Sequence, residues 1–151
     1  MDKNCVFCKI VVGEIPAVKI WESDDFLSIL DINPNTKGVS LVLPKKHYDS
    51  QVLEMEKEIY GKLMQAAREV AGVLKRGLEV RRVGLVVEGM GVNHAHVKLY
   101  PLHGLETEFG RDGAKEKTYF ERYEGYLSTK QGPEKTISEL EKVAKEIKRV
   151  R

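Results

Sequence analysis

The order of apolar segments predicts that this chain of 151 residues has an α+β fold, with an antiparallel sheet of about five strands. Two observations support this prediction. Short segments rich in aliphatic and aromatic residues precede and follow one long segment whose apolar residues recur at helical spacing. The connections between the short segments are themselves short, which favours antiparallel pairing. A long central helix is therefore expected to pack on the sheet.

Three strands are expected before the long helix. Ser23-Asp24-Asp25 separates two apolar segments and indicates a β-hairpin, and a turn cluster over residues 33–38 follows it. A third apolar segment is closed by Pro44. The three strands are residues 17–22, 26–32 and 39–43.

The long helix is indicated by apolar residues at helical spacing, with Asp49 or Ser50 as its cap and Gly77 as its end. These apolar residues are Leu53, Ile59, Leu63, Ala66, Ala67, Val70 and Leu74. Two more strands, residues 82–88 and 94–100, are expected on either side of a short Gly-Met-Gly turn.

A second helix is expected near the C-terminus. Residues 134–149 carry an apolar stripe at helical spacing among charged residues, which is typical of an amphipathic helix. We expect one domain over residues 1–151, with a core over about 5–101 and a C-terminal extension over about 102–151.

The composition argues against two classes of function. The 25 Lys and Arg residues against 23 Asp and Glu residues leave a net charge of +2, which predicts no bulk attraction to nucleic acid. No apolar run approaches the roughly 20 residues of a membrane span, and the N-terminus lacks the apolar core of a secretory signal. We therefore expect a cytoplasmic protein that binds neither nucleic acid nor membranes.

Cys5 and Cys8 have the C-x-x-C spacing, which in a cytosolic protein indicates a metal half-site or a redox pair. A redox pair of the thioredoxin type should lie where a strand leads into a helix, but no strand precedes this motif. Half a zinc site needs two further ligands. The chain has four histidines to supply them, namely His47, His94, His96 and His103.

The sharpest local feature is the segment His94-Ala95-His96-Val97-Lys98. Alternate side chains of a strand share a face, so His94, His96 and Lys98 are expected to project together. Such a row is either an exposed face with solvated side chains or a phosphate or metal site. Histidine near neutral pH acts as a nucleophile, an acid, a base or a ligand, which favours the second interpretation.

Three blocks of the sequence resemble the histidine triad (HIT) family. The first is residues 5–17 (CVFCKIVVGEIPA), and the second is residues 30–47, which contain LDINP, Gly38 and LVLPKKH. The third, His94-Ala95-His96-Val97, lies where the family motif His-φ-His-φ-His-φ-φ should lie, with φ an apolar residue. The blocks occur in order over residues 5–101. The resemblance implies a HIT-like α+β fold, nucleotide binding and frequent homodimers.

The resemblance also implies catalytic roles. His96 is expected to attack the α-phosphate and form a nucleotidyl-histidine intermediate. Lys98 stands where the family has its third histidine, and it supplies positive charge without a readily transferred proton.

Nucleotide-binding roles follow from the same resemblance. Asp31 is expected to hold the ribose hydroxyls, and Asn93 is a donor for phosphate. The expected base pocket is formed by Val6, Phe7, Ile10, Ile29 and Ile32. An ordinary core explains those five residues equally well, and a turn before Asn33-Pro34 is the alternative for Asp31.

Some members of the family carry a structural zinc ion, and the resemblance implies that its ligands here are Cys5, Cys8, His47 and His94. A Cys₂His₂ set suits Zn²⁺. The alternative is two reduced thiols, a surface His47 and a His94 that only positions the next histidine. His103 is expected to be a solvated loop residue.

The expected function is a nucleotide-binding hydrolase or nucleotidyl transferase that acts on a nucleoside phosphate derivative. Dinucleoside polyphosphates and phosphoramidates are the expected substrate classes. Lys98 and the short segment Glu88–Asn93 favour an alternative, a zinc-stabilised nucleotide-binding or scaffold protein with little catalytic activity. A homodimer is expected in either case.

Overall fold

The computed structural model describes residues 2–105 and 118–128 of the chain. The chain separates into two units, Met1–Gly110 and Arg111–Arg151. The helix predicted over residues 134–149 lies outside the described residues. Within the described residues, no helix combines the length and the apolar character that a membrane crossing requires. The single domain over 1–151 stays a prediction.

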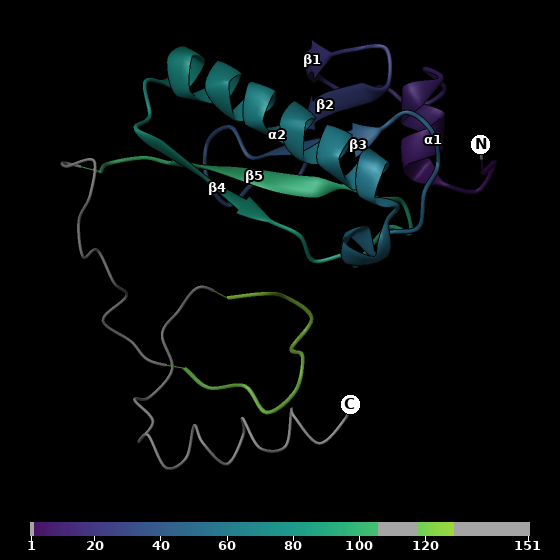
Figure 1. Cartoon of the computed structure of the whole chain (residues 1–151). Helices are drawn as coiled ribbons and strands as arrows, with labels where there is room; N and C mark the ends of the chain where they lie inside the picture. Colours follow the sequence, from purple (N-terminus) through teal and green to yellow (C-terminus); the bar gives the residue numbers. More distant parts are fainter. Residues whose placement is uncertain (1, 106–117, 129–151) are drawn as a thin grey trace. The chain divides into compact units, whose positions relative to one another are not determined.

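The first unit contains a five-stranded sheet in which every neighbouring pair is antiparallel, as predicted. The strand order is β1-β2-β3-β5-β4, so the last strand among the described residues inserts between β3 and β4 (Figure 1). This insertion places Lys98 on an inner strand of the sheet, and the two histidines of the His-x-His-x-Lys segment lie just before that strand. The strands are β1 (Lys19–Glu22), β2 (Phe26–Leu30), β3 (Ser40–Pro44), β4 (Arg82–Val86) and β5 (Val97–Leu102).

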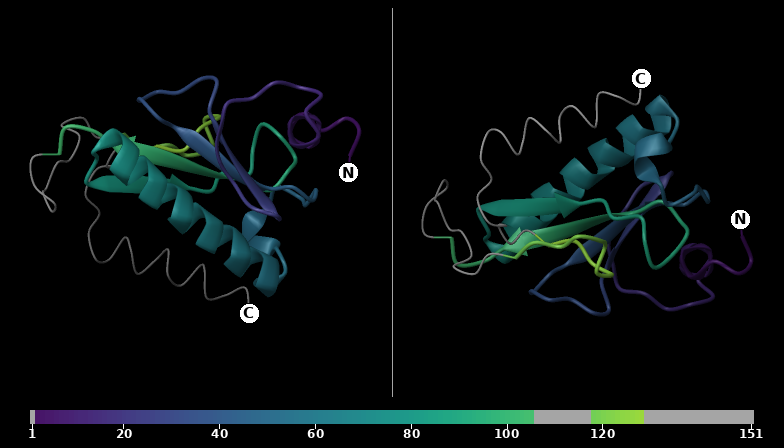
Figure 2. Two further views of the ribbon diagram at one scale, coloured as in Figure 1. Left: turned by 90° about the horizontal axis from the view of Figure 1, so that it is seen from above. Right: turned by 90° about the horizontal axis from the view of Figure 1, so that it is seen from below.

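The long helix α2 (Lys57–Leu78) packs on one face of the sheet (Figure 2). Its buried residues are five of those predicted from helical spacing, namely Leu63, Ala66, Ala67, Val70 and Leu74. Val42, Val97 and Leu99 meet them from β3 and β5. The residues on both sides of this contact form the larger of the two buried apolar clusters.

The ends of α2 differ from the sequence expectation. The Asp49 carboxylate accepts a hydrogen bond from the Gln51 N–H at 2.9 Å and forms a local turn before the short 3₁₀ helix η1 (Val52–Glu54). The long helix begins three residues later, and the predicted apolar residue Leu53 is exposed. In the part of the chain that the structure describes, no side-chain hydrogen bond caps α2, whose N-cap residue is Glu56. At the other end α2 continues past Gly77, and Glu79 ends it with a left-handed φ of 54°.

A short helix, α1 (Val6–Val11), lies against the other face of the sheet (Figure 2). Phe7 and Ile10 of α1 pack with Ile29 of β2 and with Leu41 and Leu43 of β3. Six residues are too few for a helix that is stable alone. Packing on the sheet and the contacts of its cysteines therefore hold α1 in place.

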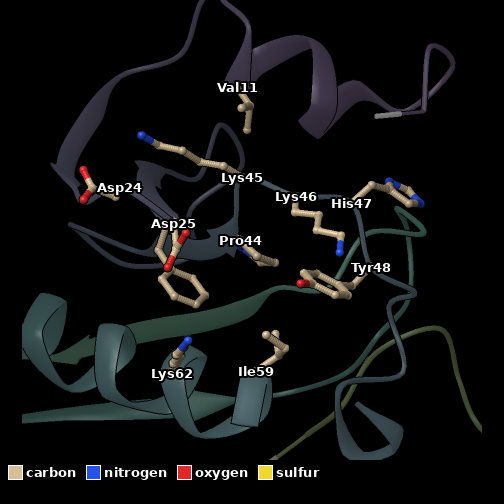
Figure 3. Close-up of a pocket in the computed structure, with 11 residues that line it drawn as sticks. Val11, Asp24, Asp25, Pro44, Lys45, Lys46, His47, Tyr48, Ile59 and Lys62 are labelled. Carbon is tan, nitrogen blue, oxygen red and sulfur yellow. The ribbon is translucent and has the colours of Figure 1, made fainter. Parts of the chain in front are cut away.

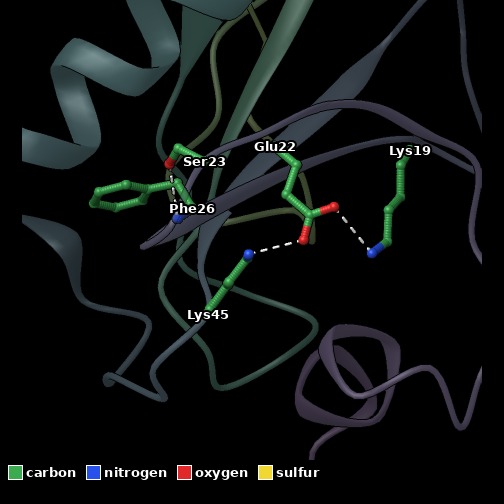
Figure 4. Close-up of polar contacts among 5 residues, drawn as sticks. All are labelled: Lys19, Glu22, Ser23, Phe26 and Lys45. Carbon is green, nitrogen blue, oxygen red and sulfur yellow. Dashed lines mark hydrogen bonds and ion pairs between the residues drawn. The ribbon is translucent and has the colours of Figure 1, made fainter.

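The β1–β2 hairpin anchors the chain that leaves β3. The Ser23 hydroxyl accepts the Phe26 N–H at 3.2 Å and closes the turn. The Glu22 carboxylate then holds Lys45 at 2.8 Å, and it also pairs with Lys19 (Figure 4). The Lys45 N–H donates to the Asp25 carbonyl at 2.7 Å. These bonds fix the segment that leads to His47.

The second unit is described only over residues 118–128, which are irregular. Within this segment the rings of Phe120 and Tyr126 meet edge to face, with their centroids 5.8 Å apart.

The packing of α2 makes a testable prediction. Leu63 is fully buried between α2 and the sheet, so Leu63→Ala should lower the free energy of unfolding by about 2–5 kcal/mol. Urea unfolding followed by circular dichroism measures this change. The matched control is Lys75→Ala on the exposed side of the same helix, which should change stability by less than about 0.5 kcal/mol. Equal losses for the two variants would contradict the packing described here.

Candidate functional site

Cys5, Cys8, His47 and His94 form a cluster that can hold a metal ion. One ligand atom from each residue lies within 4.8 Å of the others. The Cys5 Sγ is 3.4 Å from the His94 Nδ1, and the Cys8 Sγ is 3.4 Å from the His47 Nδ1. Two thiols and two imidazoles at this spacing are the donor set of a tetrahedral site. The residues present therefore fit a metal ion.

Three segments that are far apart in the sequence build this cluster. Cys5 caps α1 and Cys8 lies within it, whereas His47 follows β3 and His94 precedes β5. Both cysteines and His94 are buried, and His47 is partly exposed. Burial raises the pKa of the Cys8 thiol above its ordinary value, with a smaller contribution from the neighbouring Cys5. A cation among these groups favours the thiolate and opposes that effect.

His94 is oriented by the main chain of β3. Its Nε2–H donates to the Pro44 carbonyl at 2.8 Å, so in the neutral ring the lone pair lies on Nδ1. That nitrogen is the one that faces both cysteines, with the Cys8 Sγ at 3.7 Å. Burial lowers the pKa of His94, which keeps the ring neutral near pH 7. The ring is therefore prepared as a ligand.

His96 is a buried imidazole with a defined tautomer. Its Nδ1–H donates to the His94 carbonyl at 2.7 Å, which leaves the lone pair on Nε2. The Phe7 ring packs against it edge to face, at a centroid distance of 5.3 Å. Burial lowers the pKa of His96, and Lys98 lowers it further, although the His94 hydrogen bond and nearby carboxylates oppose this. The ring therefore offers a neutral nitrogen nucleophile at neutral pH.

The two histidines precede the strand on which the sequence placed them. The ladder between β3 and β5 begins with the pair Val42 and Val97, so β5 starts after His96. His94 and His96 nevertheless both contact Phe7 of α1, and Lys98 is paired with Leu41, a member of the cluster under α1. All three side chains therefore lie on the α1 side of the sheet, as expected.

Lys98 and Asp31, predicted to have separate roles, form an ion pair. The Lys98 Nζ is 3.6 Å from the Asp31 Oδ2, and the two side chains are 31% and 12% exposed. Lys98 reaches across β3 to the residue that follows β2. The other carboxylate oxygen, Oδ1, accepts the Asn33 N–H at 2.8 Å. Asp31 thus has the turn role that was its alternative interpretation, and one carboxylate oxygen still faces Lys98.

The five residues expected at the base pocket divide into two groups. Phe7, Ile10 and Ile29 are buried in the cluster between α1 and the sheet, so they form core. Val6 and Ile32 are on the surface, with 37% and 90% of their area exposed. Ile32, which directly follows Asp31 in the chain, is therefore not part of an enclosed pocket.

Asn93 is fixed by a neighbouring loop. Its Oδ1 accepts the Ser50 N–H at 2.9 Å, so the amide nitrogen carries the remaining donors. The Ser50 hydroxyl donates to the Gly89 carbonyl at 2.7 Å and holds the other end of the same segment. Residues 89–93 are therefore tied down at both ends, and the amide of Asn93 is exposed.

A cavity of about 650 Å³ lies on the other side of His47 (Figure 3). It is lined by Val11, Asp24, Asp25, Phe26, Pro44, Lys45, Lys46, His47, Tyr48, Ile59 and Lys62. The Lys46 Nζ lies 5.2 Å from the centre of the Tyr48 ring. None of the expected catalytic or nucleotide-binding residues lines this cavity. It meets the predicted site at His47 and at Pro44, whose carbonyl accepts the hydrogen bond from His94.

Sequence reasoning missed three features of the site. The helix α1 was not predicted, although Phe7 and Ile10 are three residues apart and lie on one helical face. The Pro44 carbonyl that orients His94 belongs to the main chain, so no residue type signals it. The ion pair joins Lys98 of β5 to Asp31, which follows β2. β3 lies between these two strands, and the sequence does not show this strand order.

Comparisons with known proteins agree with this architecture. The family model described as the HIT domain matches residues 12–104. An uncharacterized HIT-like protein of Methanocaldococcus jannaschii is 36% identical over 113 residues, which cover 72% of this chain and 87% of that protein. The adenosine 5′-monophosphoramidase of Schizosaccharomyces pombe is 32% identical over 108 residues, which cover 71% of this chain and 80% of that protein.

A solved structure extends the agreement to the fold. The crystal structure of a HIT family member from Bacillus subtilis superposes with a TM-score of 0.66 at 28% identity, and the match covers 99% of this chain and 98% of that one. The five-stranded antiparallel sheet, its long helix and the sequence matches together identify this chain as a member of the histidine triad (HIT) family.

Proposed function

We propose that this protein is a nucleotide hydrolase or nucleotidyl transferase that acts at the α-phosphate of a nucleoside phosphate derivative. The observation that carries the proposal is the state of His96, whose Nδ1–H is bound to the His94 carbonyl, so that the lone pair lies on Nε2. A family that contains an adenosine 5′-monophosphoramidase supports the choice of substrate class. Compartment and homodimer stay predictions from the sequence.

His96 is the nucleophile in this proposal. A neutral imidazole attacks phosphorus through its lone pair, and a covalent nucleotidyl intermediate divides one difficult displacement into two easier ones. The His94 carbonyl holds the ring by accepting a hydrogen bond from the His96 Nδ1–H, so the ring does not need to change tautomer before attack. Water, or a second acceptor, then releases the nucleotide.

The charges around His96 suit a phosphate group. Lys98 supplies a cation on the same side of the sheet, and the amide of Asn93 supplies a neutral donor. In this proposal Asp31 accepts the ribose hydroxyls with Oδ2, the oxygen that faces Lys98. Val6 and Ile32 offer the exposed apolar surface for the base, with Phe7, Ile10 and Ile29 behind them as core.

Zinc is the metal that best suits the cluster of Cys5, Cys8, His47 and His94. Two thiolates and two imidazoles close a four-coordinate shell, which is the pattern of a structural site and leaves no open position for a substrate. When bound there, zinc would tie α1 to the chain segments that follow β3 and precede β5. The four residues hold the N-terminal segment on the sheet, and His94 keeps its carbonyl aligned with His96.

Metal content tests the zinc proposal. Protein purified without chelator should contain about one zinc ion per chain, as a closed four-ligand site implies. Cys8→Ser should lose most of the zinc and lower the melting temperature, because metal binding and folding are coupled. His103→Ala, a histidine outside the cluster, should keep its zinc. A disulfide between Cys5 and Cys8 in reduced, metal-replete protein would contradict the assignment.

The nucleophile assignment is tested with diadenosine tetraphosphate. His96→Asn should abolish turnover and the nucleotidyl adduct seen by intact mass, but should leave nucleotide affinity within about tenfold, or about 1.4 kcal/mol. His103→Asn is the control and should react normally, because that side chain is exposed and bonded to the Lys37 carbonyl. Near-normal turnover by the His96 variant would refute the nucleophile. Nucleotide binding without turnover or adduct in the wild type would favour the scaffold alternative.

The role of Asp31 is tested with ligands that lack ribose hydroxyls. A carboxylate that accepts a hydroxyl contributes about 1.5–3 kcal/mol per bond, so Asp31→Ala should weaken AMP binding far more than binding of 2′,3′-dideoxy-AMP. Calorimetry measures both affinities. Asp49→Ala is a matched control, since Asp49 makes the same local turn bond to a main-chain N–H two residues on. If Asp31→Ala weakens both ligands equally, Asp31 is structural only.

A further inference from the structure

The position of Lys98 bears on which leaving groups the site can expel. Lys98 stands two residues after the nucleophile, and its ammonium lies 3.6 Å from the Asp31 carboxylate. An ammonium has three donors, so one can point to Asp31 while the others meet phosphate oxygens. The side chain is 31% exposed, so it is partly covered and still reaches solvent. Lysine presents a compact ammonium charge, whereas histidine is the side chain whose ordinary protonation change falls between pH 5 and 8.

No imidazole of the chain is free to replace it as a proton donor. His47 and His94 face the two cysteines, and His96 is the nucleophile. His103 is exposed and bonded to the Lys37 carbonyl. Each of the four histidines therefore has another partner or another role in the proposed reaction, and none is left to give a proton to the leaving group.

We propose that the Lys98–Asp31 pair restricts this site to nucleoside 5′-phosphate anhydrides, whose leaving group departs as a stable anion such as phosphate, polyphosphate, sulfate or carboxylate. Phosphoramidates, whose amine must gain a proton to leave, are poor substrates for this chain. This inference rests on the proposed function, in which His96 attacks the α-phosphate, and it names the substrate class of that site.

The two steps balance without a protein acid. The His96 Nε2 lone pair forms the N–P bond, the P–O bond to the leaving group breaks, and the leaving group takes that electron pair as an anion. The Nδ1 proton stays on its bond to the His94 carbonyl. Water then attacks phosphorus, the N–P pair returns to Nε2, and the proton lost by water passes to solvent. Lys98 stabilises the charge on the phosphate oxygens in both steps.

The experiment compares leaving groups on the full-length protein. The substrates are adenosine 5′-phosphate esters of phenols of graded acidity, diadenosine tetraphosphate, adenylyl sulfate and adenosine 5′-phosphoramidate. For the wild type, kcat/KM should fall steeply as the pKa of the leaving group rises. The phosphoramidate should react at least about 100-fold more slowly than the anhydrides, since a positioned general acid contributes roughly that factor or more.

The variant Lys98→His tests the cause. It should accelerate the phosphoramidate by about tenfold or more relative to diadenosine tetraphosphate, flatten the dependence on leaving-group pKa and add an acidic group to the pH–rate profile. Lys75→His, on the exposed side of α2, is the control and should leave both the slope and the substrate ratio unchanged. If the Lys98 variant does not fold, the dependence of the wild-type kcat/KM on leaving-group pKa still tests the inference.

The possible failures are distinct. A shallow wild-type slope, or a phosphoramidate that reacts as fast as the anhydrides, would overturn the inference and leave the proposed function intact. A folded Lys98→His protein with an unchanged substrate ratio would also overturn it. No turnover and no nucleotidyl adduct with any member of the series would instead refute the proposed function, and the inference would fall with it.

Discussion

The site depends on one buried side chain, His94, and on the three bonds that its polar groups make. Its Nδ1 faces the two cysteines of the α1 segment, its Nε2–H is bound to the Pro44 carbonyl at the end of β3, and its own carbonyl accepts the Nδ1–H of His96. A buried polar group without partners costs free energy, so each bond constrains the others. The residue thereby joins the N-terminal helix, the centre of the sheet and the imidazole of His96.

The bonds of His94 explain how α1, a helix of only six residues, is held on the sheet. The face under α2 has a large apolar cluster, whereas the face under α1 has a smaller one, completed at its edge by the cysteines. A metal ion bound by the Cys₂His₂ cluster would supply stabilisation that the smaller apolar cluster under α1 does not provide. The β1–β2 hairpin also supports the Cys₂His₂ cluster. Glu22 of the hairpin pairs with Lys45, and this ion pair limits the movement of the segment that carries His47.

The charges at the site are organised by strand order. Because β3 lies between β2 and β5, Lys98 and the residue after β2 are separated by one strand and face the same side. The resulting pair places a cation and a carboxylate on the same side of the sheet as His96, and the proposed function assigns them to phosphate and to the ribose hydroxyls. Lys98 stands where the family motif has its third histidine, and an ammonium differs from an imidazole in its charge and in its proton chemistry near neutral pH. The large cavity beside His47 lies outside this arrangement.

Much of the fold was readable from the sequence, because helical and strand periodicities are local. The buried face of α2, the hairpin and the five antiparallel strands follow from such patterns, and the HIT family followed from motifs such as His94-Ala95-His96-Val97. Local patterns do not show which strands become neighbours or which main-chain carbonyl meets a side chain. The convergence of Cys5 and Cys8 with His47, which the sequence alone left open, and the pairing of Lys98 with Asp31 were therefore decided by tertiary structure. So was the tautomer of His96, since it depends on a carbonyl that the fold brings within 2.7 Å.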